Sequence, residues 1–214
     1  MASTHILGFD SAGPYCSAAI LSGDLVVATA HESMARGQAE RLFPLLEETL
    51  AQAGLGWRDL TALGVGIGPG NFTGIRISVA AARGLALALG IPAIGVSLLD
   101  AVSHGATAPV LACLGAPRGQ GWFQRVGYGD PRPFGAAVDD VDERVPGLTC
   151  VGDIAAAVAA QTGTAHALAA LAPGVAVARV AATRTDWPPQ APAPLYLRAA
   201  DAAPSRDAAP VILP

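Results

Sequence analysis

Short apolar segments alternate with turn residues over the first thirty positions of the chain. Residues 5–10, 16–21 and 25–30 are mainly apolar, and glycine, proline, serine and aspartate separate them. Segments of this length with such turns between them predict a three-stranded meander. From residue 38 to 53 the apolar positions follow helical spacing, and Gly54 ends that pattern. Pro44 lies inside it, so the helix either kinks there or begins near Pro44.

A strand, a glycine-rich loop and a long helix come next. Residues 60–67 predict a buried strand, Gly-Pro-Gly-Asn stands at 68–71, and residues 72–89 follow a helical pattern before a strand at 92–96. This order predicts two parallel strands joined by a crossover helix.

The long helix carries more than one kind of face. Its apolar stripe consists of Phe72, Ile75, Val79, Ala82, Ala86 and Leu89, its row of small residues is Ala80, Gly84 and Ala88, and its arginines are Arg76 and Arg83. The stripe is enough for a domain core, whereas the small row lets another helix approach closely. Glycine inside a helix lowers stability by about 1 kcal/mol relative to alanine. Its presence at position 84 therefore indicates that another element packs closely there. We therefore predict that this helix meets a partner.

The second half of the chain has weaker patterns. Residues 110–114, 121–126 and 149–152 predict strands, while the alanine-rich residues 154–161 and 166–171 predict helices. From residue 185 onward the chain is dense in proline and predicts an extended tail, docked through Leu195, Tyr196 and Leu197. The change of pattern near residues 97–108 predicts a domain boundary there, which divides the chain into residues 1–100 and a smaller C-terminal part of residues 101–214.

Composition narrows the function classes. The net charge is −4, which disfavours a broad nucleic-acid-binding surface, so any tRNA contact is expected to be indirect. All thirteen Lys+Arg residues are arginines, and this excludes a P-loop lysine and a Schiff-base lysine.

The three cysteines form no CxxC pair and are expected to be free and packed. With no signal-peptide pattern and interrupted apolar stretches, we expect a cytoplasmic protein that does not enter a membrane.

Two stretches have the geometry of an anion site. Asp10 and Ser11 end the first strand, and Gly68, Gly70 and Asn71 lie between a buried strand and a helix N-terminus. A purely structural interpretation is favoured over an anion site: aspartate and serine form turns, and Asn71 caps the helix after a tight glycine turn. The histidines show no metal-ligand spacing, and no nucleophile motif is present, so spacing nominates no catalytic or metal-binding residue.

The sequences ILGFDSAGPYCSAAIL, ERLFPLLEETL and GVGIGPGNFTGIRISVAAARGLALALGIPAIGVSLLD, together with APLYLRAAD near the end, resemble the TsaB/YeaZ family. That resemblance implies an α/β, actin-like ATPase fold (ASKHA, ribonuclease H-like) with two lobes, the second shortened. It also implies a dimerization subunit of bacterial tRNA threonylcarbamoyladenosine (t6A) synthesis. Such a subunit binds the catalytic paralogue TsaD and supports TsaE-dependent transfer of a threonylcarbamoyl group to N6 of adenosine 37.

The resemblance also assigns roles to residues. TsaD-like sequences carry HxxxH after the long helix, and in register Leu98 and Val102 replace both histidines, which implies a noncatalytic scaffold. Asp10, Ser11, Gly68, Gly70 and Asn71 then form a vestigial phosphate-type loop. We expect no cofactor, although weak nucleotide binding at the partner interface stays open. The expected interface, which also serves a homodimer when the chain is alone, comprises Leu42, Leu46, Ile75, Arg76, Val79, Ala80, Arg83 and Gly84.

A second function class stays open beside this one. An active ATP-dependent phosphotransferase, or a metallopeptidase of the same superfold, is the alternative. The turn at Asp10 lacks one hydroxyl that the family usually has, and Gly115 and Gln120 stand where a later strand of the family is acidic. These departures weaken an inherited nucleotide site.

Overall fold

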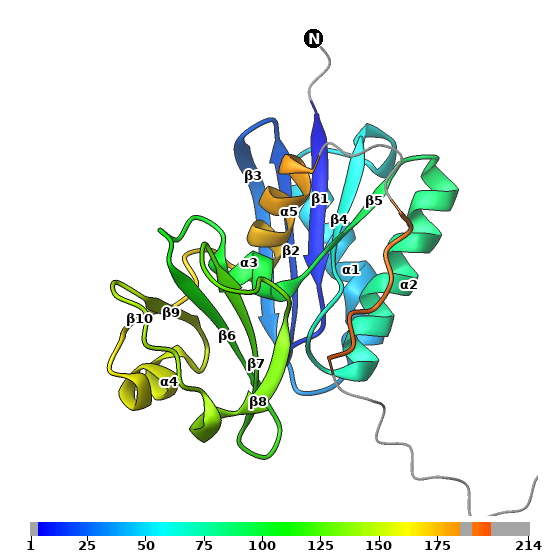
Figure 1. Cartoon of the computed structure of the whole chain (residues 1–214). Coiled ribbons are helices and arrows are strands. Elements are labelled where there is room, and N and C mark those ends of the chain that lie inside the picture. Colours follow the sequence, from blue (N-terminus) through cyan, green and yellow to red (C-terminus); the bar gives the residue numbers. More distant parts are fainter. Residues whose placement is uncertain (1–3, 185–189, 198–214) are drawn as a thin grey trace, which may run out of the picture.

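Two five-stranded sheets organise the computed structural model of the chain, which describes residues 4–184 and 190–197. Figure 1 shows the sheets in two lobes, with a short helix, α3, at their junction. The first lobe contains β1 (His5–Asp10), β2 (Tyr15–Ser22), β3 (Leu25–Ser33), α1 (Gln38–Gln52), a 3-10 turn (Trp57–Asp59), β4 (Ala62–Gly66), α2 (Phe72–Leu89) and β5 (Ala93–Val96). The remaining elements are α3 (Leu98–Ser103), β6 (Val110–Ala116), β7 (Gln120–Val126), β8 (Phe134–Ala137), a 3-10 turn (Val138–Asp140), β9 (Thr149–Gly152), α4 (Ala155–Thr162), β10 (Ala165–Ala167) and α5 (Pro173–Thr183).

The first sheet has the order β3-β2-β1-β4-β5. Strands β1, β2 and β3 form the predicted antiparallel meander, and β1, β4 and β5 run parallel. Alternate side chains of β1 enter two different cores: Leu7 and Phe9 pack with α1, whereas Ile6 packs with α5. Helices α1 and α2 therefore cover one face of the sheet, and α5 covers the other.

Helix α5 corrects the predicted division at residue 100. Although it comes late in the sequence, it packs on β1, β2 and β4 of the first lobe. Glycines allow this close approach: a Cβ at Gly8 would lie 2.5 Å from the Ala178 nitrogen, and one at Gly64 would lie 2.9 Å from the Ala181 Cβ. The chain thus crosses to the second sheet and returns, so the described residues after position 100 do not form one separate lobe.

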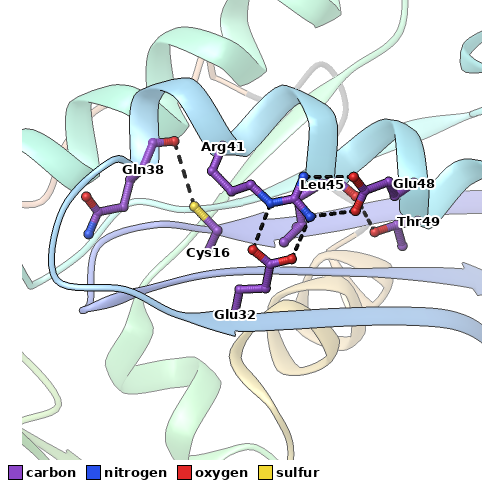
Figure 2. A network of polar contacts seen from close by, with 7 residues as sticks. All are labelled: Cys16, Glu32, Gln38, Arg41, Leu45, Glu48 and Thr49. Carbon is purple, nitrogen blue, oxygen red and sulfur yellow. Dashed lines mark hydrogen bonds and ion pairs between the residues drawn. The ribbon is translucent and has the colours of Figure 1, made fainter.

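Helix α1 begins at Gln38 and continues through Pro44, so it does not start at the proline. Pro44 lacks the amide that would bond the carbonyl of Glu40, and both residues are exposed, so water can satisfy that carbonyl. Arg41 ties α1 to the sheet edge (Figure 2): its guanidinium bonds Glu32 of β3 at 2.7 and 2.5 Å and Glu48 of α1 at 2.8 and 2.6 Å. These bonds raise the pKa of Arg41 and lower the pKa values of both glutamates.

The second sheet, with the order β10-β9-β6-β7-β8, confirms three predicted strands and corrects one helix. Residues 165–167 form strand β10, and residues 168–172 are irregular, so the helix predicted at 166–171 is wrong. The helix lies later, at α5, where Pro173 occupies its first turn. Alanine content alone does not locate a helix, and a proline at its first turn begins it rather than ends it.

Helix α2 is long enough and apolar enough, by length and composition alone, to cross a membrane. A helix of a soluble protein's core passes the same test. Here α2 packs on β4, and Arg76 and Arg83 lie on its exposed side. The expectation of a cytoplasmic protein stays a prediction.

Candidate functional site

Asp10 lies at the carboxyl end of β1 and is fully buried. The Tyr15 hydroxyl donates to its Oδ2 at 2.8 Å, and the Ala12 amide donates to its Oδ1 at 3.2 Å. Burial raises the pKa of Asp10 to about 6, against the lowering effect of these hydrogen bonds. Gly66, at the end of the parallel strand β4, makes room for it, since a Cβ there would lie 2.2 Å from Oδ1. Asp10 is thus covered by its own lobe.

Ser11 faces helix α2. Its amide donates to the Ser78 Oγ at 2.9 Å, its own Oγ lies 2.6 Å from that oxygen, and its hydroxyl also donates to the Gly74 carbonyl at 3.0 Å. A Cβ at Gly74 would lie 2.0 Å from the Ser11 carbonyl oxygen, so glycine is required for this contact. Ser11 therefore fastens α2 to β1.

The loop Gly68–Asn71 also bonds to the rest of the first lobe. The Asn71 amide donates to the Ala12 carbonyl at 2.7 Å, and the Asn71 side chain accepts from the Gly74 amide at 3.0 Å as the α2 N-cap. Gly68 has a φ of 96°, and its carbonyl accepts from the Leu98 amide. Gly70 lies so close to Ala12 that a Cβ would be 2.6 Å from the Ala12 oxygen. The structure thus brings all five phosphate-type residues together, with these donors already bonded internally.

A cleft of about 1290 Å³ opens beside this loop, between the two lobes. Its lining is largely apolar and includes Leu98 and Val102 of α3, the positions that replace the histidines of TsaD-like sequences. Over residues 4–184 and 190–197, no group of three or more His, Cys, Asp or Glu side chains is placed to hold a metal ion. Cys16, Cys113 and Cys150 are free and buried, as predicted.

Four residues of the predicted partner interface are buried inside the monomer, so their assignment is wrong. Leu42 and Leu46 are 0% exposed in the core between α1 and the sheet, and Ile75 and Val79 are 1% and 4% exposed. Helical spacing identifies an apolar stripe, but that stripe serves the protein's own core first. Contact with a partner at these four positions would require the core to open.

The other four predicted interface residues are exposed. Arg76, Ala80, Arg83 and Gly84 lie on the side of α2 that points away from the sheet. We call this side the outer face of α2; its members are Phe72, Thr73, Arg76, Ala80, Arg83, Gly84, Leu87 and Ala88. Leu87 is 88% exposed, and a Cβ added at Gly84 would meet nothing within 4 Å. This face has a centre of small residues between larger apolar ends.

Helix α1 contributes a second exposed face beside α2. Its members are Glu40, Phe43, Pro44, Glu47, Glu48 and Ala51, which we call the outer face of α1. Phe43 is 45% exposed although it is aromatic. The α1 face carries acidic residues and the α2 face carries Arg76 and Arg83. The two neighbouring helices therefore present opposite charges.

The closing segment adds a residue that sequence reasoning did not assign to this surface. Tyr196 stacks on Phe72 with ring centroids 5.1 Å apart, and the Arg76 Nε donates to its hydroxyl at 2.9 Å. The Arg76 guanidinium also lies 3.8 Å from the Phe72 ring centre. In Figure 1 this segment runs beside α2. The predicted docking through Leu195 to Leu197 is confirmed for this part of the tail. Residues 185–189 and 198–214 of the tail lie outside the described residues.

Comparison with known proteins identifies the family. A family model described as "TsaD: tRNA N6-adenosine threonylcarbamoyltransferase" matches residues 29–166, more than half of the chain. The chain belongs to this family. An uncharacterized protein of Mycobacterium tuberculosis (strain ATCC 25618 / H37Rv) is 36% identical over 203 residues, covering 93% of this chain and 94% of that protein.

Relatives with a functional name confirm the predicted TsaB/YeaZ resemblance. The tRNA threonylcarbamoyladenosine biosynthesis protein TsaB of Escherichia coli (strain K12) is 38% identical over 122 residues. The match covers 54% of this chain and 52% of that protein, about half of each. The solved structure of YeaZ from Pseudomonas aeruginosa has a TM-score of 0.67 at 23% identity and covers 84% of this chain and 90% of that one. This likeness confirms the predicted two-lobed α/β fold class.

Proposed function

We propose that this chain is a noncatalytic, TsaB-type subunit of the t6A synthesis machinery, which binds a TsaD-type partner through the outer faces of α1 and α2. The exposed outer face of α2 carries the proposal. Its small residues Ala80, Gly84 and Ala88 form a surface on which a partner helix can lie close to the α2 backbone. Phe72 and Leu87 would then supply apolar burial at either end, at roughly 25 cal/mol per Å² before association costs.

The charges of the two outer faces support association with a similarly folded partner. A partner related to this chain by a twofold axis pairs opposite charges when α1 of one chain faces α2 of the other, because Glu40 and Glu47 then approach Arg76 and Arg83. The same arrangement serves a homodimer when the chain is alone. Exposed pairs of this kind are screened by salt, so assembly should weaken as ionic strength rises.

The internal contacts of the phosphate-type loop also support a scaffold role. Asp10 lies beneath Tyr15, Ser11 bonds to α2, and the Asn71 amide bonds to Ala12. A nucleotide would have to compete with each of these contacts. The apolar side chains of Leu98 and Val102 also argue against the phosphotransferase or metallopeptidase alternative. In this proposal the TsaD-type partner supplies the chemistry, TsaE joins the complex, and tRNA is contacted only through them.

Binding to a purified TsaD-type partner tests the proposal. Ala80→Asp places a charge at the centre of the outer face of α2 and should weaken binding, measured by isothermal titration, by about tenfold or more. Ala157→Asp is the matched control, since Ala157 is an exposed alanine on α4 of the second lobe. Its affinity should equal that of the wild type. Equal binding by all three proteins would refute the assigned surface, and turnover of magnesium-ATP by the isolated chain would refute the noncatalytic role.

A further inference from the structure

The cleft between the lobes is larger than the proposed scaffold role requires. Its volume of about 1290 Å³ exceeds that of most small-molecule sites. It is built from the β1–β2 turn, the loop before α2, helix α3 and the β6–β7 turn, and the closing segment contributes Leu195, Tyr196 and Leu197 to its wall. A cleft of this composition, formed by segments from both lobes, is a place where a small ligand would be desolvated.

The charges around the cleft disfavour an anion. Of the described residues that line it, Asp153 is the one with a formal charge at pH 7, and none is an arginine. Arg118 follows the lining residue Pro117 but does not itself line the cleft. A second carboxyl group, Asp10, lies directly beneath the lining residue Tyr15. A phosphorylated ligand would therefore enter a region that holds carboxylates and offers it no cation among the described lining residues.

Asp153 occupies the second-lobe side of the cleft. It follows β9, its Oδ1 accepts from the Gly115 amide at 2.9 Å, and its side chain is exposed. Tyr15 of the first lobe and Asp153 of the second lobe both line the cleft. The Asp153 carboxylate is thus positioned to receive a donor from a molecule held between the lobes.

Aromatic rings complete the lining. Tyr15, Phe72, Trp122 and Tyr196 all border the cleft, and the His31 ring lies 5.1 Å from that of Tyr15. Aromatic faces attract organic cations and also bury apolar groups. Rings together with a single reachable carboxylate form the set of groups that recognises an ammonium group on an apolar body.

We propose that the cleft between the lobes binds a small organic cation, an amine with an apolar or aromatic body, whose ammonium group pairs with Asp153. The apolar body lies among the aromatic and aliphatic lining residues. This site opens between the lobes, shares only Phe72 with the outer faces of α1 and α2 among the described residues, and does not depend on the proposed partner.

Three probes of similar shape test the proposal: 2-phenylethylammonium, neutral 2-phenylethanol and anionic phenylacetate. Each is titrated into the full chain at pH 7 and low salt, with binding followed by calorimetry. The ammonium probe should bind with a dissociation constant of about 1 mM or tighter. The alcohol should bind about two- to fivefold more weakly, as an exposed ion pair implies, and phenylacetate more weakly still.

Two variants assign the site. Asp153→Asn should reduce the affinity for the ammonium probe to that for the alcohol and leave the alcohol unchanged. Ala169→Trp, which adds bulk to a half-buried lining residue, should weaken binding of both. The proposal is overturned if none of the probes binds, if phenylacetate binds as tightly as the ammonium probe, or if Asp153→Asn leaves the preference for the ammonium probe intact.

Discussion

At the scale of single residues, Asp10 and Ser11 show that the position of a motif can be predicted from the sequence although the exposure of its side chains cannot. The sequence pattern predicted both at the end of the first strand, and the family resemblance grouped them with the glycine loop at 68–71. They do lie there. It did not indicate that Tyr15 would cover the carboxyl group or that Ser78 would bond the serine. Those contacts depend on residues 5 and 67 positions away, and neither pairing has a sequence signal of its own.

Asp10 should leave a signature in the pH dependence of stability. Its pKa is about 6 in the folded chain against an ordinary value of 3.8, so the folded state binds the proton more tightly than the unfolded chain does. The stabilisation from this proton is complete below pH 3.8 and is lost as the pH rises through about 6. Relative to wild type, Asp10→Asn should therefore gain up to about 3 kcal/mol between about pH 4 and about pH 7.

Urea unfolding of both proteins at several pH values measures this difference. Comparing the two cancels the opposite pH dependence of Glu32 and Glu48, whose pKa values are lowered by Arg41. A difference in the free energy of unfolding that stays constant across this pH range would contradict the burial of a titrating Asp10.

At the scale of elements, strong periodicity located α1 and α2 well, and β1 and α2 matched their predicted bounds. The periodicity did not say which side of α2 would be free. Its apolar stripe packs inward through Ile75 and Val79. Its outer face consists of residues outside that stripe together with Phe72, which the stripe included but which is 40% exposed. Neither α3 nor α5 was predicted: α3 has six residues, fewer than two helical turns, and α5 begins at Pro173, which the sequence reasoning did not treat as a helix start.

Gly84 gives the most direct test of the outer face of α2 in the isolated chain. An added Cβ meets nothing within 4 Å, so Gly84→Ala should stabilise the protein by about 0.5–1 kcal/mol through helix propensity. Gly8→Ala is the contrasting variant, because its Cβ would lie 2.5 Å from the Ala178 nitrogen, and it should destabilise. Chemical denaturation measures both, and a loss of stability in Gly84→Ala would show that the face is covered.

At the scale of the whole molecule, the order of elements predicted an α/β fold and the family resemblance implied two lobes, but neither predicted the path of the chain through them. The predicted boundary at residue 100 follows the change of sheet, and α5 then returns to the first sheet. That return rests on tertiary contacts of Gly8, Gly64 and Gly174, three glycines whose close packing has no signal in the sequence. The cleft is equally a product of the assembled lobes.

Reconstituted t6A formation tests the central claim most directly. A TsaD-type enzyme, TsaE and substrate tRNA are combined with wild-type chain, Ala80→Asp or Asp10→Asn, and the modified nucleoside is quantified by mass spectrometry. We predict that Asp10→Asn supports modification at the wild-type level, whereas Ala80→Asp reduces it by about tenfold or more. Full activity with Ala80→Asp and loss of activity with folded Asp10→Asn would contradict the account and place the function in the phosphate-type loop.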